Sequence, residues 1–191
     1  MSSQKANLTN SLGLFVVALV TFFTLRWAVL EPFVIPSGSM IPTLLIHDHI
    51  GVAKWTYGWR WPFTQKWMVG PKIPSRFDIV VFKSIENPDM YMIKRVVGLP
   101  GEKVEFLKDG ELRIDGQPLP HEPAQISDFL ESDLEIDPSE VDFIFEGQNR
   151  HHLIMQRKAA FRWQDQVFTV PPGHLLMVGD NRDASHDGRF W

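Results

Sequence analysis

A long apolar segment near the amino terminus constrains this chain more than any other feature. Leu12–Leu25 carries no charged residue, Arg26 interrupts the run, and Trp27–Leu30 continues it. Crossing the hydrocarbon core of a bilayer takes roughly 20 helical residues. Leu12–Leu30 provides 19 residues if the Arg26 side chain extends to the membrane interface. The pattern predicts a transmembrane helix over residues 12–30, preceded by a short tail over residues 1–11.

Two other interpretations of this segment are weaker. A cleavable signal peptide has a basic start and a small-x-small cleavage site. Only Lys5 is basic before the run, and Glu31–Pro36 behind it contains no Ala-x-Ala. A buried core helix is disfavoured because polar residues are scarce on every face of the segment. We therefore expect an uncleaved anchor. Lys5 weakly favours a cytoplasmic amino terminus, whereas Arg26 opposes that orientation.

Beyond the anchor, the pattern changes to that of β-strands. Pro32 and Pro36 end any helix and begin extended chain. Asp109–Gly110 is a strong hairpin signal between two short strand patterns, Glu102–Leu107 and Glu111–Ile114. Further strands are expected at Phe77–Phe82, Met90–Val97, Val167–Val170 and His174–Val178. The sequence predicts a mainly β, antiparallel domain over residues 31–191.

Composition excludes several functional classes. The chain has no cysteine, which excludes disulfides, thiolate metal sites and a cysteine nucleophile. Its formal net charge of −4 is too small to indicate nucleic-acid binding. His151 and His152 are adjacent, so on a strand they point to opposite faces and make a poor metal pair. We predict no metal site and no cofactor, and we interpret the seven histidines as surface or packing residues.

An acidic segment occupies about residues 115–150. Between Arg113 and Arg150 there is no lysine or arginine, whereas carboxylates are frequent: Glu122, Asp128, Glu131, Asp133, Glu135, Asp137, Glu140, Asp142 and Glu146. Their spacing does not match an EF-hand loop. A calcium or partner site is one interpretation. We favour a solvated insert between strands.

Three polar motifs supply candidate chemistry. Ser39 lies in the segment Pro36–Met40 directly behind the anchor, Lys94 lies in an apolar strand, and a polar loop follows at Gly179–Ser185. A serine hydroxyl needs a base to act as a nucleophile, and no histidine has the context of a nucleophile elbow. A lysine can replace histidine when burial lowers its pKa and leaves it neutral. Lys94 alone would equally fit a strand lysine whose tip reaches the surface, so the assignment depends on all three motifs.

These motifs, in this order, resemble bacterial type I signal peptidase over about residues 12–191. The resemblance implies that Ser39 is the nucleophile and Lys94 the general base. It also implies that Ser37 helps to stabilise the oxyanion together with the Ser39 N–H, and that Ser185 orients the lysine amine. The ionic residues around the late motif are then structural support: Arg95, Asp180, Arg182, Asp183, Asp187 and Arg189.

The same resemblance implies a membrane-bound serine endopeptidase that removes signal peptides from secretory preproteins. Its amino terminus would be cytoplasmic, and its catalytic domain would lie on the outer, periplasmic side of the bacterial inner membrane. A preprotein segment would bind extended, by strand addition, with alanine-like side chains in shallow apolar pockets. The residues implied for these pockets, several of which also suit a core, are Phe33, Ile35, Pro36, Leu44, Ile50, Val81, Met92 and Ile93.

Aromatic residues gather between positions 55 and 67, with Lys54, Arg60 and Lys66 among them: Trp55, Tyr57, Trp59, Trp61, Phe63 and Trp67. Aromatic and basic side chains together favour the interface of a bilayer. A second packed core explains the same pattern.

Some features favour other functions. Ala184 and Gly188 stand where the family commonly has Asn and Ser, and the chain ends at Trp191, inside the late motif. A truncated, weakly active or inactive member that serves as a membrane-tethered binding domain is therefore the alternative. A self-cleaving repressor with the same Ser/Lys fold would instead carry a DNA-binding module and no anchor. Neither the individual preproteins nor the oligomeric state follows from the sequence.

Overall fold

The computed structural model describes residues 2–61, 64, 66–125, 136–147, 150–158 and 164–191. They form two compact units. One comprises Met1–Phe33 and His49–Ile73, and the other comprises Val34–Asp48 and Pro74–Trp191. Several residues singled out in the sequence lie outside the described part: Phe63, Asp128, Glu131, Asp133 and Glu135.

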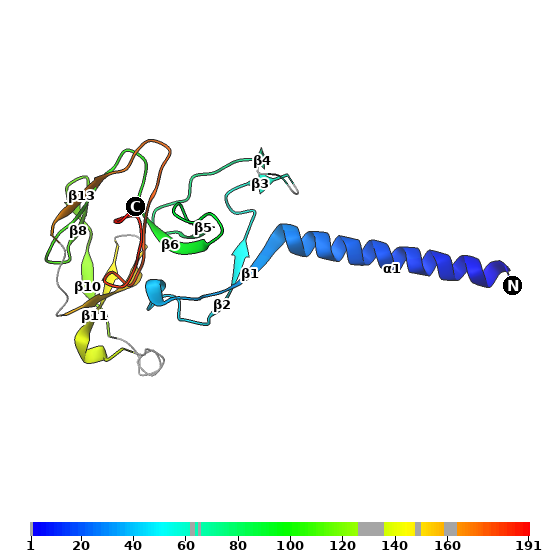
Figure 1. The fold of residues 1–191 in the computed structure, drawn as a ribbon, viewed down its shortest axis with the longest axis horizontal. Helices are drawn as coiled ribbons and strands as arrows, with labels where there is room; N and C mark the ends of the chain where they lie inside the picture. The colour runs from blue at the N-terminus through cyan, green and yellow to red at the C-terminus, as the bar shows by residue number, and fades with distance from the viewer. Residues whose placement is uncertain (1, 62–63, 65, 126–135, 148–149, 159–163) are drawn as a thin grey trace. The chain divides into compact units, whose positions relative to one another are not determined.

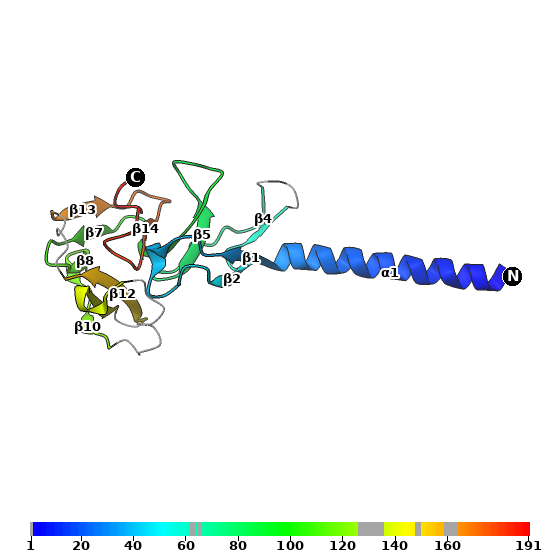
Figure 2. The ribbon, with the colours of Figure 1, turned by 60° about the horizontal axis from the view of Figure 1, so that its bottom comes forward.

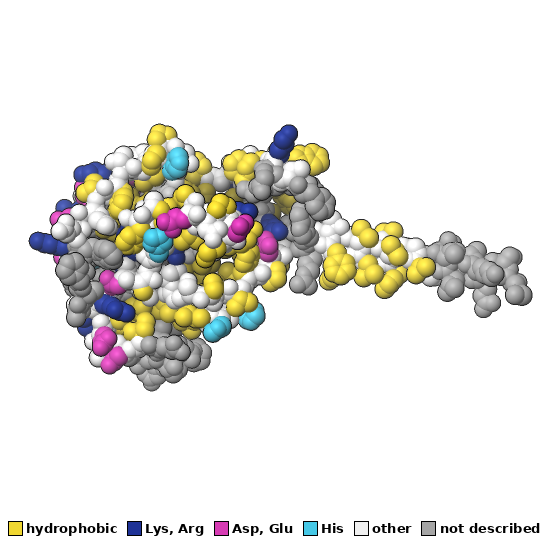
Figure 3. Space-filling view, in the orientation of Figure 1, with side chains coloured by type: hydrophobic (Ala, Val, Ile, Leu, Met, Phe, Trp, Pro, Cys, Tyr) yellow, Lys and Arg dark blue, Asp and Glu magenta, His cyan; other side chains and the backbone are white. Residues whose placement is uncertain are grey.

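Helix α1 begins the first unit and runs from Ser2 to Val29 (Figure 1). It starts before the apolar run predicted over residues 12–30. Its apolar side chains between Leu12 and Phe23 are exposed, and they form much of the described surface of the helix (Figure 3). Among the described residues, no helix combines the length and apolarity needed to cross a membrane. The side chains of Lys5 and Arg26 are outside the described set.

Four short strands follow α1 in the sequence: β1 (Leu30–Val34), β2 (His49–Ala53), β3 (Trp59–Arg60) and β4 (Trp67–Val69). β1 pairs with β2, and β3 pairs with β4 as a hairpin. The hairpin segment carries the aromatic cluster. Trp55, Trp59, Trp61 and Trp67 each expose more than a third of their surface (37–54%). These four tryptophans therefore form no second packed core.

The described residues of the second unit form three antiparallel sheets, which agrees with the predicted antiparallel β domain. The first has the order β14-β6-β5, with β5 at Ile79–Lys83, β6 at Tyr91–Gly98 and β14 at Leu176–Val178. In the second, β13, β7 and β8 lie side by side (Figure 2), followed by β9. Its bounds are β7 Lys103–Phe106, β8 Leu112–Ile114, β9 Gln117–Pro118 and β13 Gln166–Thr169. The third has the order β10-β11-β12, at His121–Pro123, Val141–Glu146 and His152–Arg157.

Local sequence explains the turns between these strands. The predicted hairpin at Asp109–Gly110 joins β7 to β8, and Gly110 has φ of 91°. Asp115 and Gly116 join β8 to β9 with φ of 51° and 77°. Two successive residues with positive φ form the tight turn that suits the right-handed twist of a hairpin, and Asp-Gly is among its preferred sequences.

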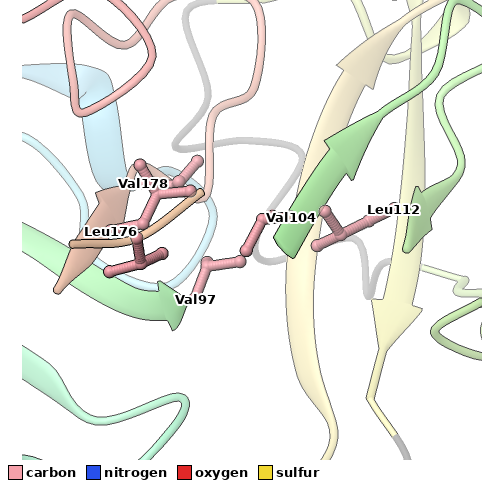
Figure 4. Packing of buried hydrophobic residues seen from close by; sticks show 6 residues of the cluster. Val97, Val104, Leu112, Leu176 and Val178 are labelled. Carbon is pink, nitrogen blue, oxygen red and sulfur yellow. The ribbon is translucent and has the colours of Figure 1, made fainter. Parts of the chain in front are cut away.

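The main core joins the first two sheets. Val97, Val104, Leu112, Leu176 and Val178 pack together (Figure 4), with Val170 completing the cluster. Burying one such side chain contributes about 1.5–3 kcal/mol. A smaller cluster consists of Ile41, Val141, Phe143 and Met155. It packs the chain just after Ser39 against β11 and β12, and so fixes the position of the serine motif.

The prediction of a solvated insert over residues 115–150 was wrong in part. The segment contains β9, β10, β11 and a short 3₁₀ helix, Pro138–Glu140. Along β11 the side chains alternate, so Val141 and Phe143 enter the smaller core cluster. Glu146 at the end of β11 is fully buried, because an arginine outside the segment compensates its charge. The side chains of Glu122, Asp137, Glu140 and Asp142 are exposed.

Candidate active site

Ser39 lies in a single 3₁₀ turn, Gly38–Met40, that follows extended chain at Ser37. The Ile41 N–H closes the turn by donating to Gly38 O over 3.2 Å. The Met40 side chain is fully buried and holds the turn against the domain, while Ser39 itself is 8% exposed. The turn therefore presents a serine at a fixed and nearly dry position.

Lys94 reaches this serine from the middle of β6. Its amine donates a hydrogen bond to Ser39 Oγ over 2.5 Å, although the two residues are 55 positions apart in sequence. The pleat places Lys94 on the same strand face as Met92 and Val96, and Val80 of β5 lies opposite it. Only 4% of the lysine is exposed. The structure thus brings together the predicted nucleophile and base.

Burial is the largest influence on the Lys94 amine and lowers its pKa from the ordinary value. The Arg189 charge acts in the same direction, whereas Asp187 and Asp180 oppose it. Among the described ion pairs, Lys94 takes part in none. The amine is therefore shifted toward the neutral form, the state in which it can accept a proton.

The late polar loop packs directly on the serine turn. The Asn181 N–H donates to Ser39 O over 3.2 Å, and Asn181 Nδ2 donates to Gly38 O over 3.1 Å. A Cβ on Gly179 would lie 2.4 Å from Ser39 O and 2.2 Å from Ser185 Oγ. Only glycine fits this approach. Sequence reasoning assigns no role to Asn181 or Gly179, although both lie inside the Gly179–Ser185 motif.

Ser185 lies at this loop but does not make the contact predicted for it. Its hydroxyl is buried and has no hydrogen-bond partner among the described residues. It packs against Gly179, close to the Asp187 carboxylate. Since the Lys94 amine donates to Ser39 instead, the predicted orienting bond from Ser185 to the lysine is absent in this arrangement.

Ser37 precedes the turn and is exposed. Its φ of −145° and ψ of 155° are those of extended chain, and its side chain makes no capping hydrogen bond to the 3₁₀ turn. The hydroxyl is therefore not committed to holding the turn, as an ordinary capping serine would be.

A buried ion pair joins the late loop to β6. Arg95 Nε and Nη2 donate to the two oxygens of Asp180 over 2.7 and 2.6 Å. Arg95 Nη1 donates to Phe77 O over 2.8 Å, and Thr43 Oγ1 donates to Asp180 over 2.5 Å. Bidentate pairs of this kind are strong and directional. The pair therefore connects the strand carrying Lys94 to the loop that contacts Ser39.

A second pair lies within the loop itself. Arg189 Nε and Nη2 donate to Asp187 over 2.8 and 2.9 Å, and the Gly179 N–H donates to the same carboxylate over 2.9 Å. Burial alone would raise the pKa of Asp187, but the Arg189 hydrogen bond and charge lower it. The supporting ionic role predicted for Asp180, Asp187 and Arg189 agrees with these contacts.

The third pair involves Glu146, which we had placed in the solvated insert. Arg182 Nη1 and Nη2 donate to Glu146 over 3.0 and 2.6 Å. Asp183, the remaining ionic residue of the motif, accepts the Arg157 N–H over 2.6 Å. No sequence signal distinguishes Glu146 from the acidic residues around it. Alternation along β11 places Glu146 on the same face as the exposed Asp142, so its burial depends on the distant Arg182.

The residues predicted for substrate pockets occupy different surroundings. Around the serine turn, Ile35 is buried, Pro36 is exposed and Leu44 is half-buried. On the sheet, Met92 shares the face of Lys94, whereas Val81 and Ile93 oppose each other on the other face: all three are half-buried. Phe33 and Ile50 belong to the first unit.

A serine hydroxyl bonded to a buried lysine amine can act as a nucleophile and base pair. Within the described part of the chain, no cluster of three or more histidine, aspartate or glutamate side chains could hold a metal ion. The contact between Lys94 and Ser39 supports nucleophilic attack by Ser39 Oγ, with Lys94 as the proton acceptor.

Comparison with known proteins agrees with this site. Residues 8–191 match the family described as signal peptidase, peptidase S26. The chain is 36% identical over 183 residues to Signal peptidase I of Pseudomonas aeruginosa, and 36% identical over 177 residues to that of Pseudomonas fluorescens. Both matches cover 93% of this chain and 61% of the relative, so the chain spans about three fifths of their length.

A third relative is matched over its larger part. Signal peptidase I of Buchnera aphidicola subsp. Acyrthosiphon pisum is 31% identical over 228 residues, covering 100% of this chain and 72% of the relative. The family match includes the serine turn, the lysine strand and the late loop. The chain therefore belongs to the signal peptidase family, peptidase S26.

Proposed function

We propose that this protein is a membrane-bound serine endopeptidase that cleaves signal peptides from exported preproteins. The observation that carries the proposal is the buried hydrogen bond between Lys94 Nζ and Ser39 Oγ. A lysine this deeply buried is rare without a carboxylate partner, and here its partner is a hydroxyl. The relatives named Signal peptidase I supply the reaction class.

In the proposed mechanism, neutral Lys94 accepts the Ser39 proton while Oγ attacks the carbonyl carbon of the scissile bond. The Ser39 N–H and the Ser37 hydroxyl stabilise the resulting oxyanion. Protonated Lys94 then gives its proton to the leaving amine, which leaves an ester on Ser39. Lys94 next deprotonates a water that hydrolyses this ester and restores the serine. Ser185 would orient the amine once the lysine has left Ser39 Oγ.

An open strand edge beside Lys94 supports extended binding of the substrate. The Val96 N–H donates to Asp78 O, and the Val96 C=O accepts from the Phe77 N–H, so both groups point toward the β5 side. Because these groups alternate along a strand, those of Ile93 face the opposite edge. On that edge the pairing of β14 stops at Arg95. A preprotein segment could therefore add as a strand next to the dyad.

Shallow pockets for small side chains would form where this added strand passes the dyad. Met92 shares the face of Lys94. Ile35, Pro36 and Leu44 flank the serine turn in sequence. Phe33, Ile50, Val81 and Ile93 stay predictions for substrate pockets.

We also propose that α1 anchors the protein in the bacterial inner membrane. The amino terminus would be cytoplasmic and the catalytic unit would lie on the outer side. The exposed apolar side chains from Leu12 to Phe23 support this placement. The exposed tryptophans of the β3–β4 hairpin suit the bilayer interface. Secretory preproteins and lipid are the partners that this assignment requires.

Cleavage of a purified preprotein with an Ala-x-Ala site, in detergent, tests the proposal. The parent should cut at the predicted bond. Ser39→Ala and Lys94→Ala should each reduce kcat by on the order of 10³-fold or more, because each removes one member of a cooperating pair. Lys103→Ala, which removes an exposed strand lysine paired only with Glu105, is the matched control and should retain activity.

The competing function is a membrane-tethered binding domain. It would be supported if the folded parent bound the preprotein but left it intact. Labelling of Ser39 by a serine-reactive signal-peptide mimic provides an independent readout, since a binding domain without an activated serine would not be labelled.

A further inference from the structure

We infer that Glu146 is a positioning residue for the active site, acting through Arg182 on the loop that holds the backbone of Ser39. The inference rests on the proposed peptidase function and adds a residue to its machinery. Glu146 belongs to β11, in the β10-β11-β12 sheet, whereas Lys94 belongs to the β14-β6-β5 sheet. The contact therefore connects two sheets through the catalytic loop.

Arginine and histidine nitrogens lie around the Glu146 carboxylate. It is fully buried, and the two Arg182 nitrogens hold it in a bidentate pair. His121 Nε2 lies 3.0 Å from its Oε2, and His152 Nε2 lies 3.2 Å from its Oε1. Burial alone would raise the pKa of Glu146, but the Arg182 charge and the histidine hydrogen bonds lower it well below its usual value. The carboxylate is therefore ionised.

Arg182 is tied to its surroundings at every polar group. Its N–H donates to Met155 O over 2.9 Å, and its Nε donates to Gly179 O over 3.2 Å. Its carbonyl oxygen accepts from Arg189 Nη2 over 2.9 Å. With the guanidinium held by Glu146, both the position and the direction of the loop backbone at Arg182 are set.

The next residue transmits this position to the nucleophile. Asn181 bonds Ser39 O through its backbone and Gly38 O through its side chain. A movement of Arg182 would therefore shift the two peptide groups that frame Ser39. It would also shift Gly179 and Arg189, which bind Asp187 near the Lys94 amine.

The ionic nature of the pair favours positioning over simple packing. Replacing a buried ion pair by apolar side chains of similar size is often neutral or stabilising, because ions are costly to dehydrate. A guanidinium that donates to both oxygens of a carboxylate is held in a defined orientation relative to it, whereas an apolar contact fixes no orientation. A displacement of about 1 Å at a catalytic centre can cost on the order of 100-fold in rate.

Steady-state kinetics of the full chain in detergent, with an Ala-x-Ala preprotein, test the inference. Glu146→Gln keeps the shape but loses the charge, and should lower kcat by about tenfold or more while KM changes less than about threefold. Glu146→Asp retains the carboxylate and should recover part of the activity. Glu102→Gln is the matched control, because Glu102 pairs with Arg76 away from the catalytic loop.

The pH profile separates positioning from a general loss of stability. Lys94 is surrounded by Ser39 and by the charges of Asp180, Asp187 and Arg189. A loosened loop would admit water to the amine and reduce the effect of burial. In Glu146→Gln the acid limb of kcat/KM should therefore move to higher pH, whereas it should not move in Glu102→Gln. Urea unfolding identifies the folded fraction of each variant.

The inference would be overturned if folded Glu146→Gln had the same kcat as the parent and the same acid limb of kcat/KM. If that variant does not fold, Arg182→Lys is measured instead. Lysine keeps the positive charge, but its single amine cannot donate to both Glu146 carboxylate oxygens and to Gly179 O at the same time. Parental kcat in Arg182→Lys would overturn the inference equally. An inactive but folded parent would contradict the proposed function itself, which is a different result from an active parent with an equally active Glu146→Gln.

Discussion

Two acidic regions of this protein have opposite fates. In the late loop, Asp180 and Asp187 are fully buried, and each binds an arginine through both oxygens. In the central segment over residues 115–150, the described carboxylates Glu122, Glu140 and Asp142 are exposed. Glu146 belongs to the second region by sequence and to the first by environment.

The comparison shows that local acidity does not predict burial. An ionised carboxylate enters a protein interior only when a cation and hydrogen-bond donors replace its water. Arg95 compensates Asp180 from 85 positions away in sequence, and Arg182 compensates Glu146 from 36 positions away. Where the fold supplies no such arginine, the acidic side chains stay in solvent.

Breaking a pair in the late loop should have the largest effect. Asp180→Asn keeps the shape of the side chain but leaves the Arg95 guanidinium buried without a counter-charge. We expect a loss of about 3–5 kcal/mol in the free energy of unfolding. Urea unfolding followed by near-UV circular dichroism measures it. A loss below about 1 kcal/mol would mean that water reaches Arg95. The carboxylates of the late loop and of the central segment would then contribute more similarly to stability than their burial indicates.

Acidification should weaken the buried cluster next. The pKa of Glu146 and that of Asp187 are both lowered in the folded state, so the stability that they contribute is present above their ordinary values and is lost as pH falls through the folded ones. His152 also has a lowered pKa, mainly from burial. Below about pH 6.5 the unfolded chain therefore binds a proton that the folded chain does not, and stability declines.

The His152 contribution can be isolated by substitution. Between pH 7 and pH 5.5, neither carboxylate has yet begun to take up protons in the unfolded chain to any large extent. His152→Gln should therefore flatten the fall in the urea midpoint over this range. An unchanged slope would assign the decline to other histidines.

The smallest effect is expected in the central segment. Asp142 lies 3.9 Å from Lys158, and both side chains are about half exposed. Exposed pairs contribute little because water screens them. Asp142→Asn should change the free energy of unfolding by less than about 0.5 kcal/mol, and it carries the same chemical change as Asp180→Asn. A loss comparable to that of Asp180→Asn would remove the distinction between the two regions.

Much of the fold could be predicted because it depends on local patterns. The strands over β5 to β8 and the Asp109–Gly110 hairpin follow from alternation and turn chemistry, which act over a few residues. β10 to β12 were not predicted, because the acidic composition around them obscured the alternation in Val141–Glu146. That strand pairs along its edge with β12, and its side chains Val141 and Phe143 pack in a cluster with Ile41 from a distant part of the chain.

The candidate site divides in the same way. Ser39 and Lys94 could be named because each lies in a short motif, and their 2.5 Å contact agrees with that choice. The roles of Asn181 and Gly179 depend on how closely the late loop approaches the serine turn, a distance that no motif encodes. Ser185 was named from its motif, yet in this arrangement its hydroxyl bonds neither Lys94 nor any other described group.

By itself, the sequence predicted an apolar helix, the antiparallel β character of the remainder, and the serine and lysine that lie in contact in the structure. Each follows from hydrophobic periodicity, turn residues or a short motif, which are properties of neighbouring positions. Only the tertiary structure decided which carboxylates are buried, which arginine each one binds, and that Glu146 lies behind the catalytic loop. A carboxylate is buried only where a cation distant in sequence compensates the cost of removing its water. That compensation is available only once folding has brought the two residues together.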